Sequence, residues 1–408
     1  MITSVIALIW PQLAAQKKYE FKTPGFRKTS TPFGLSLACP ELVEESKPVC
    51  TVTTHTDRFQ IGRGGGDFCR WCRATIYHDH DIFQIVVSHT CTKRLNRDGD
   101  KMRIAIMGSG GLGGYFGAKL VEGGTDVHFV ARGKHLEAMR QGGLRIEGPE
   151  PVHVKKVSAT DNPAEIGVAD VVMLCVKLWD TEQAMAQMRP MVGPDTAIIS
   201  FQNGVLKDDY LRAAFDQQQL MGGVGYVATT IEAPGVIRQT GPMQRLLFGE
   251  FSGVRSQRGQ ELLAACLAGG IKAELSDDIV REIWQKYVFL VGLSGTTTTI
   301  RKHIGPIRSH PQTRAFLHDV MSEVVAVGRA HGVALPENYA QVRLQLADDV
   351  SPDMTSSMHH DLQRGNRLEV RWLAGGVVQL GHAKGVPTPL NRAIADILAL
   401  HEEGGSHD

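Results

Sequence analysis

A glycine-rich turn is the first feature of the sequence that could do chemistry: Gly108, Gly110 and Gly113 have the spacing GxGxxG, between an apolar segment and a helix-like one. In dinucleotide-binding turns the first glycine permits the tight turn, the second lets a pyrophosphate approach the backbone, and the third lets helix and strand pack closely. The free N–H groups at the helix start then stabilise the phosphate charge. The pattern predicts a dinucleotide site, and the alternative is a turn that binds nothing. The residues expected to contact the nucleotide are Gly108, Ser109, Gly110, Gly111, Leu112 and Gly113.

The end of the next expected strand indicates which dinucleotide is bound. Sites that prefer NAD place an acidic residue there to accept hydrogen bonds from the ribose hydroxyls. Here the strand ends in Arg132, followed by Lys134. A guanidinium group can pair with the 2′-phosphate of NADP through two hydrogen bonds, so Arg132 favours NADP. A solvated surface arginine is the alternative.

Lys286 could move a proton. It lies in REIWQKYVFLVGL, where apolar side chains occur on every face of the expected helix, so the helix should be largely buried. Burial lowers the pKa of a lysine and makes it a usable acid near neutral pH. The alternative is an exposed ion pair with Glu282, four residues earlier in the favourable orientation. The residues alone support both interpretations equally.

Glu369 is a carboxylate that the pattern directs toward an apolar face. Leucine, tryptophan and leucine stand seven positions before it and three and four positions after it, which are helical spacings. A carboxylate on such a face needs a partner. Lys286 or a substrate hydroxyl could be that partner, and the alternative is Arg364 or Arg367 on a solvated face.

The elements around these residues predict a nucleotide-binding α/β domain followed by a helical one. The apolar segment 102–108, a helix and a second strand ending near Arg132 form a βαβ unit. Further strands are expected at 171–176 and 196–201, which gives a Rossmann-type, doubly wound and mostly parallel sheet.

Helical periodicity replaces the strand signals after about residue 277. We therefore expect an N-terminal extension over 1–101, a nucleotide-binding domain over 102–276 and an all-α domain over 277–403. The helices are expected in the stretches 277–293, 313–332, 353–385 and 391–400.

Composition excludes several classes of protein. The 408 residues are 42% hydrophobic and 21% charged, and no apolar run approaches the roughly 20 residues that cross a bilayer. The 44 basic and 43 acidic residues give a net charge of +1, which predicts no general attraction to nucleic acid or to anionic lipid. Cys175 and Cys266 lie in apolar segments, which is typical of reduced core thiols in a soluble, cytoplasmic protein.

The first hundred residues have a different character. They lack sustained periodicity, so we expect no packed domain there. Residues 31–48 resemble translated repetitive intergenic DNA of bacteria, which implies a spurious or fused extension and a true start at Met102. The alternative is a zinc site, because a CxxC pair followed by histidines has suitable ligand chemistry. Its ligands would come from Cys69, Cys72, His78, His80, His89 and Cys91.

Taken in order, residues 102–400 resemble the ketopantoate reductase (2-dehydropantoate 2-reductase) family. The matching pieces are GSGGLGGYFGAKL, FVARG, CVK ending at Lys177, FQNG holding Asn203, IWQK holding Lys286, SSMHHDLQRGNRLE holding Ser357 and Glu369, and GVPTP. The resemblance implies NADPH-dependent reduction of ketopantoate to pantoate in pantothenate biosynthesis, with homodimerisation through the helical domain.

The resemblance also implies roles for particular residues. Lys177 and Asn203 would border the nicotinamide and the substrate. Lys286 would be the proton donor, with Glu369 as the second catalytic residue, and Ser357 with Glu369 would hold the substrate. From the residues alone, Ser357 could be only a helix cap and Asn203 only a turn residue.

Two positions depart from the family. Where it usually carries asparagines that line the substrate pocket, four and eight residues after the lysine, this chain has Leu290 and Ser294. Ser294 can still hydrogen-bond to a substrate, whereas Leu290 cannot. There are therefore three alternatives to ketopantoate reduction. The chain could reduce a more apolar 2-oxo acid, it could be another hydroxyacid dehydrogenase, or it could bind NADPH without catalysis.

Overall fold

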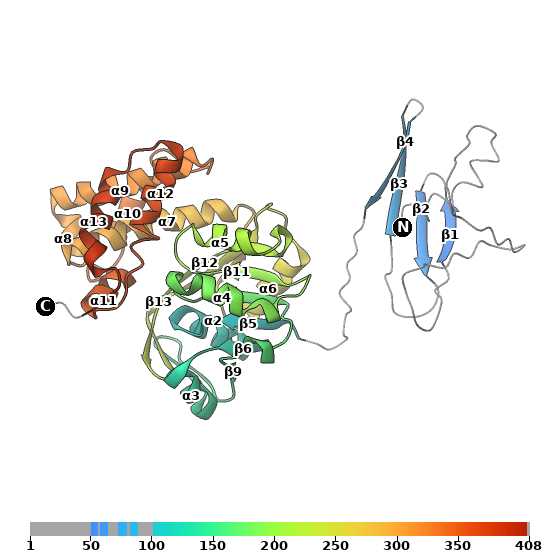
Figure 1. Cartoon of the computed structure of the whole chain (residues 1–408), viewed down its shortest axis with the longest axis horizontal. Coiled ribbons are helices and arrows are strands. Elements are labelled where there is room, and N and C mark those ends of the chain that lie inside the picture. The colour runs from blue at the N-terminus through green and yellow to red at the C-terminus, as the bar shows by residue number, and fades with distance from the viewer. Residues whose placement is uncertain (1–49, 56–57, 64–71, 80–81, 89–100, 406–408) are drawn as a thin grey trace, which may run out of the picture. The chain divides into compact units, whose positions relative to one another are not determined.

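A computed structural model describes residues 50–55, 58–63, 72–79, 82–88 and 101–405, and the chain divides into two compact units, residues 1–100 and 101–408 (Figure 1). In the first unit, four strands form an antiparallel sheet in the order β1-β2-β3-β4. They are β1 (Cys50–His55), β2 (Arg58–Arg63), β3 (Cys72–Asp79) and β4 (Ile82–Ser88). The sequence did not indicate these strands. The side chains of the suggested zinc ligands lie outside the described residues, and that hypothesis stays a prediction.

The second unit contains a ten-stranded sheet in the order β8-β7-β13-β12-β11-β10-β5-β6-β9, with β14 paired to β13. All neighbours from β12 to β9 along this order run parallel, whereas β12 with β13 and β7 with β8 are antiparallel. The strands are β5 (Arg103–Met107), β6 (Asp126–Val130), β7 (Leu144–Glu147), β8 (Val152–Val154), β9 (Ser158–Thr160), β10 (Val171–Leu174), β11 (Ala197–Ser200), β12 (Leu220–Ala233), β13 (Val236–Glu250) and β14 (Ala273–Leu275).

Helices cover both faces of this sheet, as the sequence predicts for a doubly wound fold. Side chains of α2, α3 and α6 join the apolar core on one face, and side chains of α4 and α5 join the core on the other. The central strand β10 is apolar at every position, and β11 is apolar up to its last residue, Ser200, because both of their faces are buried. The helices are α2 (Gly111–Glu122), α3 (Gly133–Gly142), α4 (Thr181–Gln187), α5 (Lys207–Ala214) and α6 (Gln257–Ala268).

The part after β14 is helical throughout the described residues, which confirms the expected fold class. In Figure 1, α7 extends from the sheet into the helical domain, and α7 and α9 contact each other in the centre of its core. The helices are α7 (Ile279–Ile300), α8 (Ile304–Ser309), α9 (Pro311–Ala330), α10 (Tyr339–Asp349), α11 (Ser357–Gln363), α12 (Ala374–Lys384) and α13 (Pro389–Leu398).

Two expectations about elements were wrong, and one element was missed. The strand expected at 171–176 ends at Leu174, and the long β12–β13 hairpin was not foreseen. The helix expected over 353–385 is two helices, α11 and α12, separated by turns. It breaks at Gly365, whose φ of +66° is a left-handed conformation that commonly ends helices. Among the described residues, none of the helices has the length and apolar character needed to span a bilayer.

The strand order places a topological switch point between β5 and β10. From β5 the chain continues to β6 on one side, and later returns to β10 on the other. Ligands of such sheets bind in the crevice outside the carboxyl ends of the strands at this point. The glycine turn follows β5 there, and Lys177 follows β10.

Candidate active site

The turn after β5 meets the steric demands that the glycine spacing predicts. Gly108 has a φ of +101°, and a Cβ on it would lie 2.7 Å from Cγ1 of Val176. A Cβ on Gly113 would lie 2.2 Å from the carbonyl oxygen of Gly108, so only glycine lets α2 pack this closely. A Cβ on Gly110 would meet no protein atom within 4 Å. Protein packing therefore does not require glycine at position 110, whereas the close approach of a pyrophosphate would. The turn fits a dinucleotide.

Hydrogen bonds hold this turn against the end of β6. The Ser109 hydroxyl donates to the carbonyl of Val130 at 3.0 Å, so this side chain faces the protein. His135 was not found by sequence reasoning, yet its Nε2 lies 3.0 Å from the Ser109 carbonyl, and its Nδ1 lies 3.1 Å from the Gly235 backbone nitrogen. Burial lowers the pKa of His135, which suits a neutral ring that donates from Nε2 and accepts at Nδ1. An isolated histidine on a polar helix gave no signal of this role.

Arg132 lies immediately before α3, at the position that the sequence indicated. Its side chain is 63% exposed, and its guanidinium group is 3.2 Å from the carboxylate of Asp180. An exposed ion pair of this kind contributes little stability. A phosphate could therefore displace Asp180 at low cost, and Arg132 as the phosphate ligand stays a prediction.

Lys286 on α7 contacts Asn203, which follows β11 and lies 83 positions earlier in the sequence. The Lys286 ammonium donates to Oδ1 of Asn203 at 2.9 Å and to the carbonyl of Gly225 at 2.7 Å. It therefore points to the sheet, rather than forming the exposed ion pair with Glu282 that the sequence left open. Burial, assisted by the positive charge of Lys207 and opposed by Glu369, lowers the pKa of Lys286 to about 8. This lysine can release a proton near neutral pH.

Glu369 is buried, as expected, but its hydrogen-bond partner differs from those that the sequence suggested. It lies between α11 and α12, where its carbonyl accepts from the N–H groups of Trp372 and Leu373 in a single turn, whereas Gly365 interrupts the helical spacing back to Leu362. Its Oε1 accepts a hydrogen bond of 3.2 Å from the backbone N–H of Leu178, and its Oε2 lies 3.9 Å from Nζ of Lys177. The partner is thus the loop after β10 rather than Lys286, Arg364 or Arg367.

Lys177 joins the two domains through two carboxylates. Its ammonium is 3.0 Å from the carboxylate of Asp361 on α11, in addition to the neighbouring Glu369. Both carboxylates raise the pKa of Lys177 against the opposing effect of its burial. Asp361 was missed, although it lies within the quoted motif and one helical turn after Ser357. The i, i+4 spacing places Ser357 and Asp361 on the same face of α11.

Two suggested substrate ligands have other surroundings in this structure. Ser357 is exposed in the first turn of α11, and the helix cap is the preceding Ser356, whose hydroxyl accepts from the N–H of His359. The Ser294 hydroxyl is buried and donates to the carbonyl of Leu290 in its own helix at 2.6 Å. Both roles in substrate binding stay predictions.

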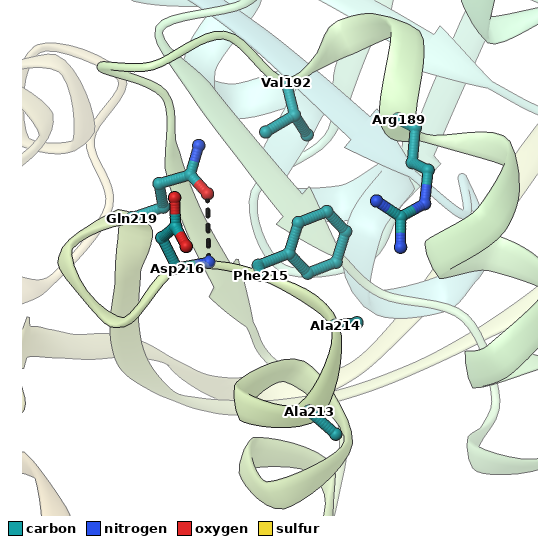
Figure 2. Close-up of a pocket in the computed structure, with 7 residues that line it drawn as sticks. All are labelled: Arg189, Val192, Ala213, Ala214, Phe215, Asp216 and Gln219. Carbon is teal, nitrogen blue, oxygen red and sulfur yellow. Dashed lines mark hydrogen bonds between the residues drawn. The ribbon is translucent and has the colours of Figure 1, made fainter.

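A small cavity lies between the carboxyl end of β11, strand β12 and helix α7. Its lining includes Gln202, Lys207, Lys286, Tyr287 and Leu290. A larger open pocket of about 440 Å³ is lined by residues around Phe215 and contains none of the candidate site residues (Figure 2). Of the candidate catalytic residues, Lys286 lines the small cavity, whereas Glu369 does not.

Gln202 was also missed, because the sequence offers only a glutamine before the Asn-Gly turn. Its amide nitrogen donates to the carbonyl of Val176 at 3.0 Å and to the hydroxyl of Thr181 at 2.8 Å. Its amide oxygen accepts from the Ser200 hydroxyl at 3.0 Å. These bonds connect the ends of β10 and β11 and thereby set the spacing of Lys177 and Asn203.

A dinucleotide turn at the switch point and a buried lysine facing the same edge of the sheet from a helical domain define an oxidoreductase that acts on a CH–OH group. A family model described as ketopantoate reductase PanE/ApbA matches residues 104–253, and the corresponding C-terminal model matches residues 278–402. The chain belongs to the ketopantoate reductase family.

Individual relatives cover the same part of the chain. A 2-dehydropantoate 2-reductase of Mesorhizobium japonicum is 33% identical over 328 residues, which are 75% of this chain and 100% of that protein. An uncharacterized oxidoreductase of Bacillus subtilis, YkpB, is 30% identical over 303 residues, or 74% and 99% of the two chains. The crystal structure of a PanE/ApbA family ketopantoate reductase from Ralstonia eutropha superimposes with a TM-score of 0.68 at 34% identity, covering 74% of this chain and 98% of that one.

Proposed function

We propose that this protein reduces ketopantoate to pantoate with NADPH, as a cytoplasmic step of pantothenate biosynthesis. One observation carries the proposal: a lysine with a lowered pKa on α7 contacts Asn203 at the edge of the sheet where the dinucleotide turn lies. The names of the relatives, among them the 2-dehydropantoate 2-reductase of Mesorhizobium japonicum, support the choice of substrate.

The residues of the turn would hold the cofactor's pyrophosphate, and Arg132 its 2′-phosphate. When bound, NADPH supplies the hydride that reduces the ketone carbon. Lys286 stabilises the negative charge that develops on the carbonyl oxygen and transfers its Nζ proton to that oxygen. Asn203 and the Gly225 carbonyl orient the ammonium by accepting two of its hydrogen bonds. Lys177 supplies a positive charge for the substrate carboxylate, and Asp361 and Glu369 hold it in place.

The first test is an NADPH oxidation assay with ketopantoate, on the full chain and on a chain that begins at Met102. Turnover that is saturable in both substrates is expected. Absence of NADPH consumption with ketopantoate and with a panel of other 2-oxo acids would contradict catalysis altogether.

The Arg132→Ala variant tests the cofactor preference. We expect its KM for NADPH to rise about 10- to 100-fold, because a bidentate charged contact to the 2′-phosphate is lost. Its KM for NADH should change little, since NADH lacks that phosphate. The matched control is Arg140→Ala on the adjoining helix α3, where the guanidinium is paired with Asp161. Equal effects of Arg132→Ala on both cofactors would remove Arg132 from this role.

Reduction of a more apolar 2-oxo acid is the second candidate function, and Leu290 favours it. This side chain lines the small cavity, and the nearby Ser294 hydroxyl is already bonded to the helix backbone. A cavity wall without a polar contact discriminates poorly in favour of a substrate hydroxyl.

Leu290→Asn is therefore expected to raise kcat/KM for ketopantoate about 10- to 100-fold relative to a 2-oxo acid without a hydroxyl group. Competition between the two substrates in one reaction measures this ratio directly. An unchanged ratio would show that position 290 does not contact the distinguishing hydroxyl.

A further inference from the structure

Lys207 is a second ammonium group in the cavity that holds Lys286. It is the first residue of α5, and its side chain is only 1% exposed. Its ammonium is 2.8 Å from the carboxylate of the adjacent Asp208, whose side chain is 6% exposed. Both Lys207 and Lys286 line the same cavity.

This placement is costly for stability. The N-terminus of a helix carries positive partial charge, which disfavours a cation there. Removing two charges from water also costs about as much as their mutual attraction returns, so a buried ion pair is weak evidence for a stabilising role. Stability therefore does not account for the burial of Lys207 and Asp208, whereas a role in the chemistry of the cavity would.

The surroundings of Lys286 supply that explanation. Its ammonium is hydrogen-bonded to neutral oxygens, those of Asn203 and Gly225. These partners do not cancel the charge of Lys286, so the positive charge of Lys207 in the same cavity acts on a full ammonium charge. Repulsion between two ammonium groups is present while Lys286 is protonated and disappears once it has given up its proton. The same positive charge also favours an alkoxide that develops in the cavity.

We propose that Lys207 is a positioning residue of the reaction, whose buried charge makes Lys286 readier to give its proton to the substrate oxygen. The inference rests on the proposed reduction, in which Lys286 loses one proton and becomes a neutral amine. Asp208 holds the Lys207 ammonium in place and limits how strongly it repels Lys286. Burial is the largest cause of the lowered pKa of Lys286, and the charge of Lys207 is the second.

The other titratable groups around Lys286 act differently. Glu369, from the turns after α11, opposes Lys207 by raising the pKa of Lys286. The Tyr226 ring of β12 lies 5.6 Å from the ammonium, and burial raises the pKa of its phenol, so it stays neutral. On α7 itself, Glu282 is one turn away, and the neutral Tyr287 hydroxyl donates to the carbonyl of Leu373.

Two substitutions with opposite expected effects test the proposal on the full chain. With NADPH and a 2-oxo acid, the alkaline limb of the kcat profile should move up by about one pH unit in Lys207→Met, because the repulsion is removed. It should move down in Asp208→Asn, which leaves the charge of Lys207 uncompensated. A merely structural role would not shift the limb in opposite directions. Lys119→Met is the matched control, since Lys119 has a 10% exposed side chain paired with Glu150 on another element.

Two further measurements keep the test decisive. Lys207→Arg retains the charge and should leave the limb near its original pH. Lys207→Met/Asp208→Asn leaves no unpaired buried charge, so it serves if the single variants fold poorly, and it should still move the limb up, because the charge of Lys207 is gone. Competitive acylation of Lys286 with acetic anhydride, followed by mass spectrometry, titrates the amine without turnover. If no variant turns over, the proposed function fails while the acylation profile still decides this inference. A Lys286 titration that Lys207→Met leaves unchanged, or that both single variants shift the same way, overturns it.

Discussion

Replacing Lys286 by alanine is expected to lower kcat about 1,000-fold, within the range that general acids contribute. NADPH affinity should stay within a few fold, because the turn after β5 is built without α7. Lys286→Arg should be nearly as inactive, since an arginine keeps the charge but does not release its proton. Steady-state kinetics and fluorescence titration with NADPH measure the two quantities. Turnover retained in Lys286→Ala would show that the proton comes from another group.

The pH profile of the unmodified enzyme belongs to the same prediction. Lys286 has a pKa of about 8, well below the ordinary value for lysine, and it donates only when protonated. The kcat/KM for the 2-oxo acid should therefore fall as the pH rises through about 8, and this limb should be absent from the residual activity of Lys286→Ala.

The lowered pKa of Lys286 also makes the stability of the fold depend on pH, and stability should rise over the pH range in which activity falls. Because the folded pKa of Lys286 is lowered, its burial disfavours the folded state fully below pH 8, and the penalty fades as pH rises toward the unfolded value. Lys286→Met should accordingly keep or raise Tm at pH 7. A large loss of Tm would mean that the bonds to Asn203 and Gly225 outweigh the desolvation of the ammonium.

Glu369→Ala should have the second-largest effect, a loss of about 100- to 1,000-fold in kcat/KM. The substitution removes the acceptor of the Leu178 N–H and one of the two carboxylates beside Lys177. A buried N–H left without a partner costs about 1–3 kcal/mol, and the loop after β10 should move.

Glu369→Gln separates the two contributions. The glutamine can still accept from Leu178 but carries no charge beside Lys177, so we expect a smaller loss, mainly in KM for the 2-oxo acid. Glu403→Gln is the control, because it removes a 72% exposed carboxylate that pairs with Arg367 nearby. If Glu369→Gln matched Glu369→Ala in both activity and Tm, the charge would account for the whole effect.

Three site residues show how much of the site could be predicted from the sequence: Lys286, Asn203 and Glu369. Family motifs named all three, and the apolar sequence around Lys286 predicted its burial. The sequence placed Glu369 on a helix and left its partner open between Lys286, a substrate hydroxyl and a nearby arginine, yet Glu369 lies after the end of α11 and bonds the backbone after β10. The pattern was misleading because apolar residues at helical spacings also occur in compact turns once Gly365 has ended the helix.

The dinucleotide turn, the βαβ unit around it and the helical C-terminal part could all be predicted from the sequence, because they depend on local sterics and on periodicity along one segment. Three relations appear only in the folded chain: Lys286 contacts Asn203, Lys177 lies between Asp361 and Glu369, and Lys207 lines the same cavity as Lys286. Those relations join groups as far as 192 positions apart, as between Lys177 and Glu369. They depend on how helices and sheet pack against one another, which no local pattern encodes.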